Sequence, residues 1–236
     1  AAGWLSPTEG TPDIYRDTGN SGVCNEGCQW ISVGGNGYTG GKGYQLPNSG
    51  RAYAGFFTMT AIGADNREYL YTELTDSLKA GKRYCVSFYT SLANYSGYAI
   101  DGIGVCITQQ PFYDCGSTNL LPCTQDIGNP SGNVINDTVN WVHVTDTFVA
   151  LGGERYLTIG NFRSDANNQI VLTGMPPTLY AYHYIDDVEL FFCDSILVSN
   201  PTYNTISIFP NPSNGQFNIT GNFPLSTELV VYNMLG

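Results

Sequence analysis

The sequence contains few charged residues, and basic residues are the scarcest. Its 236 residues include nine Lys and Arg against 20 Asp and Glu, which gives a formal net charge of −11. Binding of nucleic acid needs a basic surface, so this composition argues against a nucleic-acid partner. The negative charge is compatible with a cation such as calcium, with a neutral polysaccharide as ligand, or simply with solubility.

Long apolar runs and helical periodicity are also missing. No run of about 18 apolar residues occurs, so no segment is expected to span a membrane. Apolar residues do not follow a period of about 3.6 residues over long stretches, so little helix is expected. In their place, 28 Gly and many Asn, Ser and Thr fit short strands joined by turns. We therefore expect an all-β fold, an antiparallel jelly-roll sandwich.

Alternation of apolar and polar residues marks the expected strands. They cover 52–61, 68–74, 83–92, 99–108, 141–150, 155–162 and 180–193, whereas residues 1–50 are expected to be rich in loops. In the last strand, Asp186 shares a predicted face with Val188, Leu190 and Phe192. Asp101 leads an apolar row in the same way. A carboxylate in such a position must be paired, hydrogen-bonded or bound to a metal.

Catalytic signatures are missing as well. The two histidines, His143 and His183, lie in predicted strands, and no GxSxG nucleophile motif occurs. Two carboxylates could still meet in the folded chain and form the pair that hydrolyses glycosides. We expect a protein that is not an enzyme, and rank catalysis behind binding and assembly.

Seven cysteines favour an exported protein with disulfides. Cys24 and Cys28 lie in one glycine-rich loop, and Cys115 and Cys123 bracket another, so we expect one local disulfide in each loop. Zinc binding is the alternative, but neither pair has the usual two-residue spacing and both histidines are distant in sequence. The other three cysteines lie in strand-like runs, where at most two can pair and one buried thiol remains: Cys85, Cys106 and Cys193.

Aromatic residues are frequent, with 17 Tyr among them. Trp30, Tyr38 and Tyr44 lie on the glycine-rich N-terminal loops and form a candidate ligand-binding platform. Flat exposed rings stack on the C–H faces of sugar rings, and neighbouring Asn and Gln can bond the hydroxyls. The alternative is that these rings, like most in a tyrosine-rich β protein, are core or cross-strand partners.

Four segments together resemble a jelly-roll domain found in secreted and cell-surface proteins of the Bacteroidetes. They read TPDIYR at 11–16, EYLYTELTDSLKAGKRYCVSFYTSLANYSGYAIDGIGV at 68–105, GGERYLTIGNFRSDAN at 152–167 and YHYIDDVEL at 182–190. Such domains are similar to galactose-binding-like jelly rolls, many of which are carbohydrate-binding modules. The resemblance implies adhesion or glycan binding by a domain over residues 1–196.

The same resemblance implies a structural calcium near the start of the last strand. Asp186 is the matching position and Asp187 its neighbour, with Glu9 and Asp13 the nearest N-terminal acidic candidates. Asp101 is a further candidate ligand, because calcium takes six to eight oxygen ligands. Alternatively, Asp101 and Asp186 accept backbone N–H bonds or pair with Arg67 or Arg83.

The C-terminal segment resembles the type A sorting domain of type IX secretion substrates. The matching motifs are FPNP at 209–212, NGQF at 214–217 and VYNMLG at 231–236. We expect a linker over 197–203 and a partial sorting domain over 204–236. The resemblance implies export by the type IX secretion machinery to the outside or the surface of a Gram-negative bacterium.

This segment has only three expected strands, at 206–209, 216–220 and 228–232, which is too few for an independently stable sandwich. Further chain, packing on the main domain, or strands from a neighbouring copy could complete it. The last possibility gives an alternative function, a structural subunit of an extracellular filament or surface assembly.

Three short motifs resemble the Asp-Ser/Thr-aliphatic site of O-glycosylation in Bacteroidetes proteins. They place candidate glycans on Ser77, Thr138 and Ser195. The alternative is that each motif is an ordinary turn capped by its aspartate.

Overall fold

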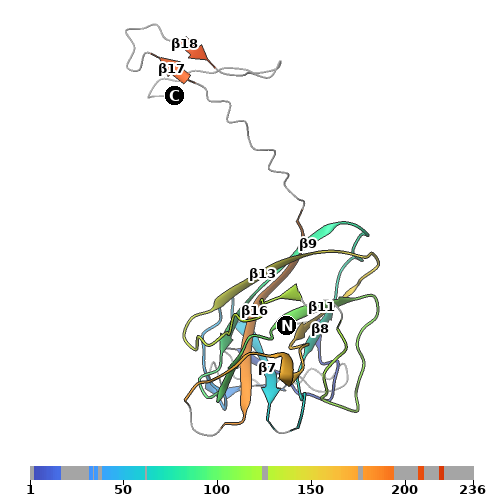
Figure 1. Cartoon of the computed structure of the whole chain (residues 1–236), viewed down its shortest axis with the longest axis vertical. Helices are drawn as coiled ribbons and strands as arrows, with labels where there is room; N and C mark the ends of the chain where they lie inside the picture. The colour runs from blue at the N-terminus through green and yellow to red at the C-terminus, as the bar shows by residue number, and fades with distance from the viewer. Residues whose placement is uncertain are drawn as a thin grey trace. The chain divides into compact units, whose positions relative to one another are not determined.

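In the computed structural model, the regular secondary structure of the described residues is almost entirely β-strand (Figure 1). The described residues are 3–16, 32–33, 35–36, 39–61, 63–123, 127–174, 178–193, 207–209 and 218–220. The chain divides into two compact units, Ala1–Asp194 and Ser195–Gly236, where the sequence pattern puts a boundary after residue 196. In the described part, the one helical element is a 3₁₀ turn, η1 (Asp165–Asn167), and no helix is long and apolar enough to cross a membrane.

The first unit is a sandwich of two main sheets. The five-stranded sheet has the order β1 (Trp4–Leu5), β8 (Leu70–Glu73), β14 (Tyr156–Gly160), β11 (Gly104–Thr108) and β12 (Ile127–Gly128). The six-stranded sheet has the order β13 (Val142–Val149), β9 (Arg83–Leu92), β16 (Tyr180–Phe192), β7 (Ala52–Thr60), β2 (Asp13–Arg16) and β3 (Ser32–Val33). All neighbours are antiparallel except β2 and β3.

Three smaller sheets complete the description. β10 (Tyr98–Ile100) pairs with β15 (Ile170–Leu172), and β4 (Gly35–Asn36), β5 (Thr39–Gly40) and β6 (Gly43–Tyr44) form a three-stranded sheet. In the second unit, β17 (Ser207–Phe209) pairs with β18 (Asn218–Thr220) in antiparallel register.

The core lies between the two main sheets, where each strand presents alternate side chains. Val86 and Phe88 of β9 face Val105 and Ile107 of β11 across one continuous apolar cluster. Burial of each such side chain contributes about 1.5–3 kcal/mol. The predicted all-β sandwich is therefore confirmed, with the long strands where the alternation places them.

The predicted strand 99–108 is divided into β10 and β11 because Asp101 turns the chain between them. Its buried carboxylate lies 3.3 Å from the Arg163 guanidinium and accepts N–H bonds from Gly132 at 2.7 Å and Gln169 at 2.8 Å. Of the alternatives to calcium, the backbone N–H bonds are therefore present at Asp101, whereas its ion pair is with Arg163, and Arg67 pairs with Asp165 at 2.5 Å. Asp101 therefore joins three loops by charge and hydrogen bonds.

The alternation predicted for β16 is wrong at one point, because the strand has a bulge. Residues Asp186 and Glu189 lie opposite Tyr89 and Ser87, so β16 has one residue more than β9 over this stretch. Asp187 takes a positive φ of 47° there. Ile185, predicted on the opposite face, therefore packs in the same core as Val188 and Leu190.

The disulfides differ from the predicted local pairs. Cys85 is bonded to Cys193 and Cys106 to Cys123, with Cα–Cα distances of 5.4 and 6.0 Å. The predicted pairing of Cys115 with Cys123 is wrong, because Cys123 reaches β11, and Cys115 is disulfide-bonded to a different partner. No buried thiol remains among the three strand cysteines. The predicted pair Cys24 and Cys28 lies outside the described residues.

Candidate functional site

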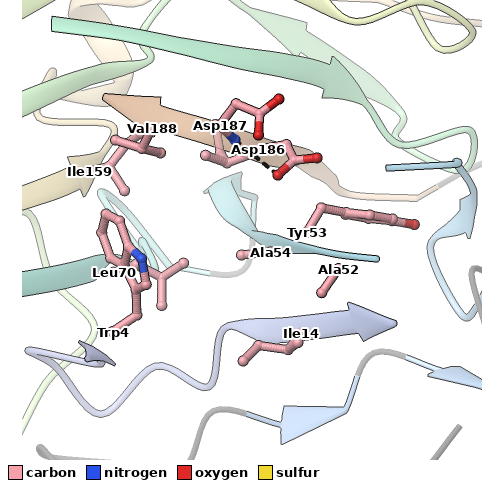
Figure 2. A pocket seen from close by; sticks show the side chains of 11 residues that line it. Trp4, Ile14, Ala52, Tyr53, Ala54, Leu70, Ile159, Asp186, Asp187 and Val188 are labelled. Carbon is pink, nitrogen blue, oxygen red and sulfur yellow. Dashed lines mark hydrogen bonds between the residues drawn. The ribbon is translucent and has the colours of Figure 1, made fainter. Parts of the chain in front are cut away.

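A cavity of about 210 Å³ opens between the two main sheets beside the β16 bulge. Figure 2 shows the side chains that surround it. The five-stranded sheet contributes Trp4, Leu70 and Ile159, and the six-stranded sheet contributes Ile14, Ala52, Tyr53, Ala54, Ile185, Asp186, Asp187 and Val188. The cavity arises because β7 begins with Ala52 and Ala54 at core-facing positions, where larger side chains would fill the space.

Two adjacent carboxylates stand at this cavity. Asp186 accepts hydrogen bonds from the backbone N–H of Asn48 at 2.8 Å, of Ser49 at 3.3 Å and of Asp187 at 2.9 Å, the last drawn as a dashed line in Figure 2. Asp187 accepts bonds from the Asn48 amide at 2.7 Å and the Ser49 hydroxyl at 2.5 Å. Partial burial raises the pKa of Asp186 against these hydrogen bonds. The loop at 48–49 therefore fixes both carboxylates in place.

The five predicted calcium ligands are not brought together. Asp13 accepts a bond from the Tyr182 hydroxyl at 2.6 Å, Glu9 is exposed, and Asp101 is bound to Arg163. Within the described residues, no group of three His, Cys, Asp or Glu side chains could hold a metal ion. At Asp186 and Asp187, each carboxylate oxygen already accepts at least one hydrogen bond, which leaves fewer free lone pairs than the six to eight oxygen ligands of calcium require. These contacts give no support to calcium there, and metal binding stays a prediction.

A cluster of aromatic rings lies on the outer face of the six-stranded sheet, away from the core between the two sheets. We call this part of the sheet the covered face. Its rings are Tyr15, Tyr53, Phe57, Trp141, Tyr180, Tyr182 and Tyr184. Tyr15 stacks on Tyr53 with 4.9 Å between centroids, and both meet Tyr184 edge-on. Four of the tyrosines are at most 4% exposed, so these rings offer no open platform.

Residues 41–49, which we call the strap, run over this face. The Tyr53 hydroxyl donates to the Gln45 carbonyl at 2.9 Å and the Trp141 indole N–H to the Leu46 carbonyl at 2.8 Å. The Lys42 ammonium lies 4.3 Å from the centroid of Phe57 and 4.7 Å from that of Tyr180. These contacts hold the strap down by hydrogen bonds and cation–π attraction.

A glycine allows the strap to approach so closely. Gly43 has φ of +134°, and a Cβ there would lie 2.9 Å from the Asn94 backbone nitrogen. The next residue, Tyr44, donates its N–H to the Asn94 side-chain oxygen at 2.7 Å. The Tyr44 ring itself is 52% exposed. It is the described member of the predicted platform, whereas Trp30 and Tyr38 lie outside the described residues.

The histidines have different surroundings. His183 is fully buried, its Nδ1 lies 2.8 Å from the Thr58 hydroxyl, and burial lowers its pKa to about 4. His143 is exposed and stacks on Tyr89 with 4.6 Å between centroids. Neither histidine lines the cavity beside the bulge.

The predicted glycosylation residues differ from one another in solvent exposure. Ser77 is exposed, Thr138 is half-buried, and Ser195 lies outside the described residues. Asp137 caps the turn after it by accepting N–H bonds from Val139 and Asn140, both at 2.8 Å, which lowers its pKa. That geometry matches the alternative of a capped turn. Glycosylation stays a prediction.

Trp4 is the site residue that the sequence did not predict. It lies in a two-residue strand inside a loop-rich stretch, where no alternation marks it. Its register opposite Thr72 of β8 places it over the cavity. An isolated Trp near the N-terminus was the only available signal.

Comparison with known protein families gives no match, and no curated protein matches. Solved structures match at low similarity. The CBM22-1 xylan-binding domain of Paenibacillus barcinonensis Xyn10C is 13% identical, with 80% of this chain and 85% of that chain covered and a TM-score of 0.39. The K1 cleaved adhesin domain of Lys-gingipain from Porphyromonas gingivalis W83 is 16% identical, with 82% and 93% covered and a TM-score of 0.37.

A longer chain, the CBM22-1–GH10 modules of Clostridium thermocellum xylanase 10B complexed with xylohexaose, is 13% identical at a TM-score of 0.43. Residues covering 81% of this chain match 26% of that one. At such identities and TM-scores, the similarity provides no functional argument for this chain.

Proposed function

We propose that this protein is a non-catalytic glycan-binding or adhesion module whose ligand enters the cavity beside the β16 bulge. One observation carries the proposal: the fold brings an indole, Trp4, and two carboxylates, Asp186 and Asp187, to the same small cavity. A sugar ring presents apolar C–H faces and hydroxyl donors together. Aromatic rings complement the first and carboxylates the second.

The size of the cavity fits part of a glycan rather than a large ligand. Its volume of about 210 Å³ is below the roughly 300–1,000 Å³ usual for small-molecule sites, which suits about one sugar ring. An uncharged sugar is favoured over an acidic one, because Asp186 and Asp187 repel anions and the chain carries a net charge of −11.

A glycan array followed by calorimetry tests this proposal. Trp4→Ala should weaken binding at least tenfold, because it removes the ring that the five-stranded sheet contributes to the cavity among the described residues. Asp187→Asn should weaken it by about ten- to a hundredfold, since a hydrogen bond to a charged acceptor is worth about 1.5–3 kcal/mol and Asn tolerates the positive φ. Tyr113→Ala, at a ring 62% exposed and outside the cavity, is the control. No binding to any glycan would refute the proposal.

The absence of catalysis is part of the proposal. His183 is buried and uncharged at neutral pH, and the two cavity carboxylates are sequence neighbours with fixed hydrogen-bond donors. Incubation with the bound oligosaccharide should release no reducing ends. Turnover abolished by Asp186→Asn would contradict this part.

Export by the type IX secretion system is proposed from the motifs at 209–236. The disulfides Cys85–Cys193 and Cys106–Cys123 fit an extracellular place, because the cytosol keeps thiols reduced. Deletion of residues 204–236 should leave the protein in the periplasm of a host that has this machinery. Unchanged export of the deleted protein would refute this assignment.

The alternative function, a structural subunit of a filament or surface assembly, has one observation in its favour. All three residues of β15 are exposed apolar side chains, with Ile170 44%, Val171 45% and Leu172 74% exposed, on a two-stranded sheet. Exposed apolar edges favour strand pairing between chains. Size-exclusion chromatography over a range of concentrations should then show association that Leu172→Lys removes and that the similarly exposed Leu151→Lys leaves unchanged.

A further inference from the structure

β16 extends beyond its neighbour in the six-stranded sheet. Its last pair with β7 is Ile185 with Ala54, whereas its pairing with β9 continues to Phe192 opposite Tyr84. Over 186–192, β16 therefore has one strand partner among the described residues. The loop at 48–49 lies beside the first two of these residues through its hydrogen bonds to Asp186 and Asp187, and the cavity at Trp4 lies at the same end.

A second hollow, of about 480 Å³, lies at the other end of the same edge. Its apolar lining consists of Leu74, Leu78, Tyr84, Leu190, Phe191 and Phe192, and its polar lining of Thr75, Asp76, Ser77 and Lys79. Phe191 and Phe192 are 47% and 48% exposed, which is unusual for two successive large apolar residues.

The two hollows are lined by different residues of the same two stretches of chain, β16, and β8 with the residue after it. On β16, Val188 lines the first and Leu190 the second, two residues apart and packed on the same core. On the opposite sheet, Leu70 at the start of β8 lines the first and Leu74 just after β8 lines the second. From Asp186 to Phe192 the distance is about 17 Å, because five residue steps along the partner strand, from Tyr89 to Tyr84, span it at roughly 3.3 Å per residue.

We propose that the second hollow is a further subsite for the same glycan, so that one groove along 186–192 binds a linear, uncharged oligosaccharide of several sugar units. The inference rests on the proposed function and extends it from a single sugar ring to a chain. The mixed lining carries it: the rings of Tyr84 and Phe192 offer stacking surfaces, while Asp76 and Ser77 offer hydrogen-bond partners for hydroxyls.

The second hollow is held rigidly. The disulfide Cys85–Cys193 joins the residues next to Tyr84 and Phe192, and these two rings meet edge-on at 5.7 Å. On the other wall, the Lys79 N–H donates to the Tyr84 hydroxyl at 3.1 Å. A preformed site loses less conformational entropy on binding, so it favours ligand affinity.

Two joined subsites predict a dependence on chain length that one cavity does not. A short sugar fills only the first subsite, while a longer chain reaches the second at little further entropic cost. Affinity should therefore rise steeply once the oligosaccharide spans about 17 Å. The second subsite should contribute to the binding of these longer chains and not to that of shorter ones.

Calorimetry with uncharged β-1,4-linked gluco-, xylo- and manno-oligosaccharides of one to eight units tests the proposal. For the wild type, affinity should rise at least tenfold between the disaccharide and the hexasaccharide of the preferred series. Phe192→Ala should bind the disaccharide like the wild type and lose that rise. Trp4→Ala should weaken both ligands. Tyr113→Ala, at a ring that is 62% exposed and lines neither hollow, is again the control.

The outcomes separate the two proposals. A hexasaccharide affinity unchanged by Phe192→Ala, with binding still lost in Trp4→Ala, would overturn the second subsite and leave the first. No oligosaccharide binding by the wild type would overturn both. Binding of extended peptides instead, again reduced by Phe192→Ala, would identify the open β16 edge as a strand-pairing site and overturn the glycan assignment. Melting temperatures of all variants check that each is folded.

Discussion

The covered face and the groove are two aromatic regions beside the same strand, β16, but they differ in what lies over them. Tyr182 and Tyr184 on the covered face lie beneath the strap and are at most 1% exposed. In the groove, Phe191 and Phe192 are about half exposed and next to a hollow. Residue type alone therefore does not distinguish a binding platform from a core. The difference is whether another segment, here the strap, packs over the rings.

Charged side chains, one basic and one acidic, contact the rings of the covered face. The Lys42 ammonium lies over three of its rings, and the Asp13 carboxylate accepts the Tyr182 hydroxyl. Asp186 and Asp187, at the Trp4 end of the groove, are instead contacted by neutral groups: their hydrogen bonds from the strap come from Asn48 and Ser49. The first region is therefore expected to act in stability and the second in binding.

The largest test of this difference is Tyr182→Ala compared with Trp4→Ala. Tyr182 is fully buried, lies 5.1 Å from Phe57 between centroids and requires a glycine at Gly55, where a Cβ would lie 2.5 Å from it. Its removal should lower the free energy of unfolding by about 3–5 kcal/mol and leave glycan affinity of the folded protein within about twofold. Trp4→Ala should weaken glycan binding at least tenfold and cost less stability than Tyr182→Ala, because Trp4 is only partly buried against the core. Chemical denaturation and calorimetry measure both; equal stability loss would erase the distinction.

The sequence predicted the strands better than the site. Alternation placed β7, β9, β13 and β16 within about two residues, because one face of each strand is buried. The bulge at Asp187 could not be found this way, since the pattern does not show that β9 is one residue shorter over that stretch. Nor could it reveal that 41–49 would cover Tyr53 rather than form an open loop, because such contacts join distant parts of the chain.

The next effect is a pH dependence that belongs to the covered face. Glu68 is buried, accepts N–H bonds from Phe57 and Thr11 at 2.9 Å, and has its pKa raised from 4.5 to about 7 mainly by burial. A raised carboxyl pKa contributes stability that is present at low pH and lost as pH rises through about 7.

Between pH 5 and 8, the free energy of unfolding should therefore fall by about 2 kcal/mol through this group. In Glu68→Gln, which is neutral throughout, that contribution should be absent, and stability should instead rise with pH through His183, because its pKa is lowered from 6.5 to about 4 and its contribution is opposite in sign. Asp137, whose pKa is lowered, acts in the opposite direction and only in more acidic solution. A wild-type slope identical to that of the Gln variant would show that Glu68 is not the group responsible.

A smaller effect is expected from the cation over the covered face. Lys42→Met keeps the length and apolar stem of the side chain and removes the ammonium from the Phe57 and Tyr180 rings. The loss should be on the order of 1 kcal/mol in the free energy of unfolding. The exposed Lys82→Met is the control, with no expected change. A loss equal in both variants would mean that net charge, and not the rings, accounts for the effect.

The smallest expected effect concerns Asp186 and Asp187, at the Trp4 end of the groove. The resemblance to galactose-binding-like domains implies a calcium ion there. Asp186 and Asp187 already accept five hydrogen bonds from the backbone N–H of Asn48, Ser49 and Asp187 and from the Asn48 and Ser49 side chains. A calcium ion at these oxygens would have to displace donors, and calcium prefers six to eight oxygens. Addition of EDTA to purified protein should therefore leave the melting temperature unchanged. A fall in melting temperature that calcium reverses and magnesium does not, and that Asp187→Asn removes, would show instead that the loop at 48–49 rearranges around a metal.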